Sequence, residues 1–140
     1  MMGLVYAEIT LINGDDLTLM RRHIIGEDEV KSMKINMLVD SGAYFMAINE
    51  NIQSYLQLPL VEKRKAVMAN GEVQEFDVVG PIQVKFKNRR CVTDAFVLKG
   101  DNEPLLGTIP MEDMDVMIHP LKGELIVNPE SPDFAMMKMK

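Results

Sequence analysis

Alternation of apolar and polar residues is the feature that most limits what this chain can fold into. In Leu4–Ile12 an apolar side chain stands at every second position, and Met33–Val39 and Ile82–Phe86 repeat this period. Alternation of this kind is typical of a strand that turns one face toward a core and the other toward solvent. The three segments therefore predict strands with one buried face each.

Further short segments are separated by residues that favour turns. Asn13-Gly14 predicts a hairpin, after which Leu17 and Leu19 restart the alternation. Asn70-Gly71 predicts a second hairpin. We expect further strands at Tyr44–Ile48, Leu60–Ala69, Cys91–Leu98, Val116–Ile118 and Leu125–Val127.

Two short helices complete the expected elements. Asn49 is a suitable N-cap for a helix that Pro59 would stop from extending. Ile109–Asp115 is compatible with a second helix, because Pro110 suits a first turn. Many short strands with one or two short helices indicate a mostly-β fold, expected as a closed or nearly closed barrel.

The length of 140 residues fits one domain, and a hydrophobic content of 47% is enough for a core. We expect this domain to span residues 1–128. Residues 129–140 contain two prolines and a Met/Lys-rich end, so we expect a poorly ordered C-terminal tail there.

Charge and cysteine content exclude several classes of function. A net charge of −6 argues against nucleic acid or an anionic membrane as the main partner, because both require concentrated Lys and Arg. Cys91 is the only cysteine, so no internal disulfide can form and a reducing, cytoplasmic location is expected. Neither a membrane span nor a signal peptide is visible. No spacing of His, Asp and Glu suggests a metal site, and we expect no cofactor.

The stretch with the clearest chemical content is Met37–Ala43. Three apolar residues lead directly into Asp40, Ser41, Gly42 and Ala43. A carboxylate at the end of a core strand is held still, which suits a catalytic group. The same tripeptide Asp-Ser-Gly also forms ordinary turns, so on its own it leaves both interpretations open.

A second segment, Pro104-Leu105-Leu106-Gly107, follows in the later half of the chain. With both segments present in this order, the chain resembles the retropepsin-like (retroviral-type, clan AA) aspartic proteases. The resemblance spans roughly Gly3 to Asn128 and is closest to small single-domain prokaryotic members, whose pattern also includes Met68-Ala69-Asn70-Gly71.

The resemblance implies a catalytic role for Asp40. Two carboxylates about 3 Å apart cannot both ionise and share one proton, which is the behaviour already described for aspartic proteases. The chain carries one Asp-Ser-Gly, so the second aspartate must come from another chain, and the resemblance implies a homodimer. Family members often join through chain ends, so Leu4–Ile12 and Leu125–Val127 are the expected interface.

The neighbouring motif residues acquire roles from the same resemblance. Ser41 keeps the hydroxyl of the family's Thr/Ser position, Gly42 allows close approach of backbone, and Ala43 leaves room for substrate. Leu105, Leu106 and Gly107 are expected to support the catalytic loop. The hairpin Met68, Ala69, Asn70 and Gly71 is expected to be a flap that closes over the substrate, although a purely structural hairpin would have the same sequence.

Two functions remain open at this stage. The first is an aspartic endopeptidase that acts as a homodimer on extended peptides with apolar residues near the cleaved bond. The second is a fold of the same kind used for dimerisation or peptide binding, with little or no turnover. The intact Asp40-Ser41-Gly42 favours the enzyme.

Overall fold

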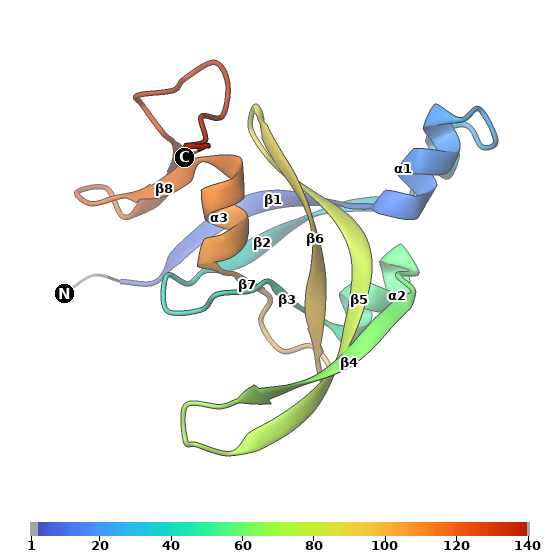
Figure 1. Cartoon of the computed structure of the whole chain (residues 1–140), viewed down its shortest axis with the longest axis horizontal. Coiled ribbons are helices and arrows are strands. Elements are labelled where there is room, and N and C mark those ends of the chain that lie inside the picture. Colours follow the sequence, from blue (N-terminus) through green and yellow to red (C-terminus); the bar gives the residue numbers. More distant parts are fainter. Residues whose placement is uncertain (1–2, 140) are drawn as a thin grey trace.

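The computed structural model describes residues 3–139 (Figure 1). Its strands are β1 (Val5–Asn13), β2 (Ser32–Val39), β3 (Ala47–Asn49), β4 (Leu60–Val67), β5 (Val73–Phe86), β6 (Arg89–Leu98), β7 (Leu105–Leu106), β8 (Val116–His119) and β9 (Glu124–Val127). Its helices are α1 (Gly14–Arg21), α2 (Glu50–Leu56) and α3 (Thr108–Met114), with a short 3₁₀ helix, η1, at Glu27–Glu29. The predicted mostly-β composition is confirmed.

Seven strands form one sheet in the order β1-β2-β7-β3-β6-β5-β4, and β1 also pairs with β5. Most neighbours are antiparallel, whereas β2 pairs with β7 and β3 with β6 in parallel. Strands β8 and β9 form a separate two-stranded sheet. The long β4–β5 hairpin projects away from the helices α3 and α1 (Figure 1).

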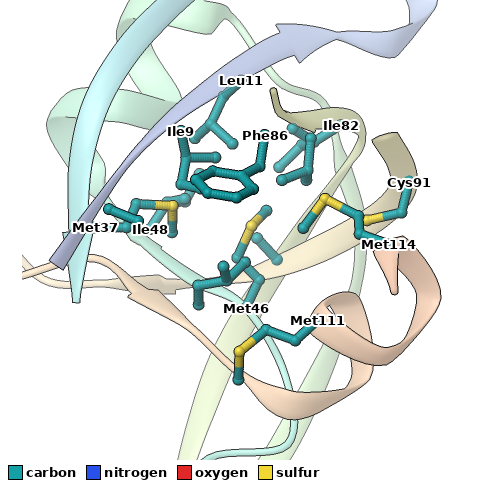
Figure 2. Packing of buried hydrophobic residues seen from close by; sticks show 14 of the residues in the cluster. Ile9, Leu11, Met37, Met46, Ile48, Ile82, Phe86, Cys91, Met111 and Met114 are labelled. Atoms are coloured by element: carbon teal, nitrogen blue, oxygen red, sulfur yellow. The ribbon is translucent and has the colours of Figure 1, made fainter. Parts of the chain in front are cut away.

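The buried faces follow the predicted alternation. Ile9 and Leu11 of β1 and Met37 of β2 are completely buried, and Figure 2 shows them packed around Phe86. Several methionines, including Met46, fill the space between the sheet and α3. Burial of alternate residues on β2 leaves its last residue, Val39, in the core, so the next residue, Asp40, follows directly at the end of this internal strand.

The hairpin predicted at Asn13-Gly14 is wrong, because these residues begin helix α1 instead. The Asn13 side-chain oxygen accepts a hydrogen bond from the Asp16 N–H at 3.1 Å, and its Nδ2 donates to the Leu56 carbonyl at 2.8 Å. Asn is as good an N-cap as it is a turn residue, and acidic residues in a first helical turn are favourable. Leu17 and Leu19 therefore lie on a helix without buried residues, not on a strand.

The short strand expected at Tyr44–Ile48 lies slightly later, at Ala47–Asn49, and Asn49 also caps α2 as predicted. The predicted strand starting at Cys91 begins earlier, because Arg89 already pairs with Phe86 of β5.

The segment that begins at Asn128 is hydrogen-bonded to Asp115, the residue that ends α3. Asp115 accepts hydrogen bonds from Asn128 Nδ2 and the Met136 N–H, each at 3.0 Å, and from the Ser131 hydroxyl. These bonds, with the nearby Arg89 guanidinium, lower the pKa of Asp115 to about 2. Arg89 is buried and donates to the Ser131 carbonyl. The division between a domain ending at residue 128 and a tail stays a prediction.

Candidate active site

Asp40 stands at the point where β2 leaves the sheet. The Leu38 N–H donates to the Pro104 carbonyl at 3.1 Å, and the Asp40 N–H donates to the Leu106 carbonyl at 2.9 Å. The hydrogen bonding between β2 and β7 therefore extends to the backbone of Asp40. The two segments that the sequence singled out, Asp40–Ala43 and Leu105–Gly107, lie side by side.

The Asp-Ser-Gly turn is closed by its own hydrogen bonds. The Ala43 N–H donates to the Asp40 carbonyl at 3.2 Å, and the Gly42 N–H donates to the Asp40 carboxylate oxygen Oδ1 at 2.9 Å. Asp40 is half-buried, whereas Ser41 and Gly42 are exposed. One carboxylate oxygen is thus held by backbone, and the side chain still reaches the surface.

Gly107 allows the two segments to approach each other. A Cβ at this position would overlap the Phe45 carbonyl oxygen and would come within 2.8 Å of the Tyr44 carbonyl carbon and 2.9 Å of the Ala43 carbonyl oxygen. Just beyond it, the Thr108 N–H donates to the Ala43 carbonyl at 2.8 Å. Only glycine fits here, so Gly107 sets the distance between α3 and the loop that carries Asp40.

A cavity of about 440 Å³ opens on one side of the turn. Gly42 and Ala43 line it from the turn, and Met68 and Ala69 line it from the β4–β5 hairpin. The predicted catalytic loop therefore shares this cavity with Met68 and Ala69, two of the four residues of the predicted flap. Asn70 and Gly71 are exposed at the hairpin tip and lie outside the cavity lining.

The tip of this hairpin is a tight turn. The Met68 N–H donates to the Glu72 carbonyl at 2.7 Å, the Asn70 side chain accepts from the Glu72 N–H at 3.0 Å, and Gly71 has a φ of 85°. The hairpin at Asn70-Gly71 is therefore confirmed as a structure. Its role as a flap stays a prediction.

Sequence reasoning missed three phenylalanines in this cavity. The ring of Phe96 stacks on Phe45, with centroids 5.6 Å apart, and on Phe76, with centroids 5.8 Å apart. All three line the cavity. They come from the segment after the turn, from β5 and from β6, and only strand register brings them together, so no local sequence signal could have identified them.

A second cavity, of about 370 Å³, also reaches the turn but shares no lining residue with the first. It is lined by Ser41, by residues of α3 and by β8. Ser41 thus faces a different space from Gly42 and Ala43.

We also looked in the described residues for a reactive thiol, a group of metal ligands and a membrane-spanning helix. Cys91 is buried, and burial raises the pKa of its thiol to about 12, so it is protonated and shielded at neutral pH. Within residues 3–139, no three His, Cys, Asp or Glu side chains are grouped so that they could hold a metal ion. None of the helices in the described range is long and apolar enough to cross a membrane.

Comparison with known proteins agrees with this geometry. The family of gag-polyprotein putative aspartyl proteases matches residues 28–112, which is more than half of the chain and includes both Asp40 and Gly107. The chain belongs to this family of retroviral-type aspartyl proteases. No curated protein matches the sequence significantly.

The fold of this aspartyl protease family member is also similar to a solved structure. The crystal structure of the retroviral protease-like domain of Ddi1 from Leishmania major matches with a TM-score of 0.57 and 14% identity. The match covers 90% of this chain and 89% of that one. At this identity the likeness shows the retropepsin-like fold alone.

Proposed function

We propose that this protein is an aspartic endopeptidase whose catalytic dyad consists of Asp40 from each of two identical chains. The observation that carries the proposal is the position of Asp40. Its backbone N–H is bonded to Leu106, one carboxylate oxygen is held by the Gly42 N–H, and the half-buried side chain belongs to the turn whose Gly42 and Ala43 line the cavity. A carboxylate held in this way needs only a second one to form a proton-sharing pair.

The proposed reaction uses water and no covalent intermediate. The ionised Asp40 accepts a proton from a water molecule, whose oxygen attacks the carbonyl carbon of the peptide bond. The protonated Asp40 of the other chain hydrogen-bonds to the carbonyl oxygen and stabilises the tetrahedral intermediate. The carbon–nitrogen bond then breaks as a carboxyl group passes a proton to the leaving amine.

The cavity beside Gly42 and Ala43 supports an extended peptide as substrate. Its walls include Met68 and the stacked Phe45, Phe76 and Phe96, which favour apolar side chains next to the cleaved bond. Closure of the β4–β5 hairpin over the peptide would exclude water and fix the substrate. A reducing, cytoplasmic setting is part of the proposal and rests on the single, buried Cys91.

The experiment that tests this function is incubation with a peptide library, with and without a statine-type inhibitor. Native protein is expected to cleave peptides with apolar residues at the cut, and the inhibitor is expected to block the cleavage. Asp40→Asn is expected to abolish hydrolysis and keep the fold, because Asn is nearly isosteric. Asp101→Asn, which changes an exposed loop aspartate, is the matched control and should retain full activity.

Hydrolysis that persists in purified Asp40→Asn protein would reject the catalytic assignment. Binding of peptides without any cleavage by native protein would favour the alternative, a dimerisation or peptide-binding module.

A further inference from the structure

A small recess of about 160 Å³ adjoins the cavity beside the Asp-Ser-Gly turn. The recess shares Phe45 and Phe96 with that cavity, but its other walls include three charged side chains, Glu62, Arg64 and Asp94. We call this space the charged recess. A peptide that extends beyond the apolar cavity in this direction therefore meets ionised groups.

Strand pairing places the charged recess on the same face of the β4–β5 hairpin as the cavity. Glu62 lies opposite Val78 of β5, and Val78 lies opposite Phe96 of β6, so these residues form a row across three neighbouring strands (Figure 1). Arg64 and Ala66 follow Glu62 at two-residue intervals, which puts them on the same face of β4. Because Ala66 lines the cavity, the row of residues from cavity to recess is set by sheet structure.

Asp94 supplies the charge of the opposite wall. It stands two residues before Phe96 on β6 and therefore on the same face of that strand. Its side chain lies against the backbone of Gly80, where an added Cβ would overlap Asp94 Oδ1. Within residues 3–139 the Asp94 carboxylate has no ion-pair partner. It is therefore free to pair with a cation that enters the recess.

Arg64, by contrast, already has partners. Its guanidinium carbon lies 5.9 Å from the centroid of the Phe45 ring, and its Nε lies 3.8 Å from Glu62 Oε1. The Glu62 carboxylate offsets the charge of Arg64, so the charge that remains in the recess is the negative charge of Asp94. A cationic ligand is favoured over an anionic one.

We propose that the charged recess binds a lysine or arginine side chain of the substrate, two residues away from the apolar side chain that fills the cavity. This inference rests on the proposed function, because it takes an extended peptide in the cavity as its starting point. In an extended peptide, every second side chain points the same way, about 7 Å from the previous one. The ammonium or guanidinium group would pair with Asp94, while its aliphatic stem would pack on Phe96.

The opposite face of the hairpin provides a matched control for the charge of Asp94. There Lys63 Nζ lies 3.8 Å from both Glu75 and Asp77, and none of these three residues lines the cavity or the recess. Asp77→Asn therefore removes the same charge as Asp94→Asn from the nearby sheet, but outside the proposed binding surface.

Paired peptide substrates test the inference. The peptides are identical except for lysine, norleucine or glutamate at two positions before or after the apolar residue at the cut. For native protein and for Asp77→Asn, kcat/KM should be about threefold to fivefold higher with lysine than with norleucine in one of the two directions, the effect of a partly exposed ion pair. High salt should weaken this preference, and lysine one position away, which points to the other side, should have none.

Asp94→Asn should abolish the preference for lysine, and thermal unfolding checks that this variant keeps its fold. Arg64→Gln is an independent second variant that should strengthen the preference, because it removes the positive charge in the recess. Binding of the same peptides to Asp40→Asn protein, measured by fluorescence anisotropy, gives a readout that does not require hydrolysis.

Three results would overturn the recess as a site for a basic side chain. They are equal kcat/KM for the lysine and norleucine peptides in both directions, a preference for lysine that Asp94→Asn retains, and a preference for glutamate. Hydrolysis without a preference for lysine would leave the proposed function standing. Lysine-selective binding that depends on Asp94, in a native protein that hydrolyses no peptide, would uphold the recess and contradict the proposed function. Absence of both binding and hydrolysis would contradict both.

Discussion

The main-chain N–H of Asp40 donates a hydrogen bond to the carbonyl oxygen of Leu106 over 2.9 Å. This bond joins the two segments that define the candidate site, although many residues separate them in the sequence. It also continues the parallel pairing of β2 with β7, in which Val39 lies opposite Leu106. The aspartate is therefore positioned by sheet structure and not by a free loop.

Replacement of Gly107 should disturb this arrangement more than any other glycine substitution near the site. In Gly107→Ala, the new Cβ would overlap the backbone of Tyr44 and Phe45, which cannot move aside as a flexible side chain could. We expect a loss of about 3 kcal/mol in the free energy of unfolding, measured by urea denaturation. Gly3→Ala is the control, because a Cβ there would meet nothing within 4 Å. Equal stability of the two variants would show that the close approach at Gly107 does not constrain the loop.

Stability should depend on the protonation of Asp115. Hydrogen bonds from Ser131, Asn128 and Met136 lower its pKa from 3.8 to about 2 in the folded protein. The unfolded chain therefore binds the proton first as pH falls, so this contribution is complete above pH 3.8 and is lost as pH decreases toward 2. In native protein the free energy of unfolding should fall through this window.

Asp115→Asn should flatten that pH dependence and lower stability at neutral pH, because the charged acceptor is lost. Asp113→Asn, at an exposed position on α3, should leave the pH profile unchanged. The measurement is urea denaturation at a series of pH values. An identical slope in native and Asp115→Asn protein would mean that another carboxylate accounts for the acid sensitivity.

Met68 should contribute to substrate binding from the β4–β5 hairpin. Its side chain lines the cavity together with Gly42 and Ala43. Met68→Ala should lower kcat/KM for an apolar peptide by about fourfold to fifteenfold, equivalent to one or two buried CH₂ groups at ~0.8 kcal/mol each. Val73→Ala, on the same hairpin but outside the cavity lining, is the matched control. Equal kcat/KM in the two variants would argue against the hairpin as a flap.

The sequence predicted the parts of the fold that local patterns determine. Alternation identified β1, β2 and the later half of β5, and Asn49 correctly predicted the start of α2. Asn13 was misassigned because the same residue type favours a hairpin turn and a helix N-cap. In the structure Asn13 caps the helix and also donates to the Leu56 carbonyl, a partner 43 residues away that no local window contains.

In the candidate active site, too, the sequence predicted only the residues that belong to short local motifs. Asp40 and Gly107 were identifiable because each belongs to a short motif, and the structure brings their segments together. The stack of Phe45, Phe76 and Phe96 depends on the registers of three separate segments. Ser41 and Ala43, although close in sequence, face different cavities because the turn between β2 and β3 divides the surface at that point.

A subunit-mixing experiment tests most directly whether two chains share the catalytic dyad. Native protein is held at constant concentration while Asp40→Asn protein is added, and peptide hydrolysis is measured after the subunits have exchanged. Because a mixed dimer would contain a single aspartate, activity per native chain should fall to about half at equal amounts and to about a tenth at ninefold excess. Asp101→Asn protein, added in the same way, should raise total activity. If Asp40→Asn protein leaves native activity unchanged after exchange, or if native protein hydrolyses no peptide, the account of a dyad shared between two chains is contradicted.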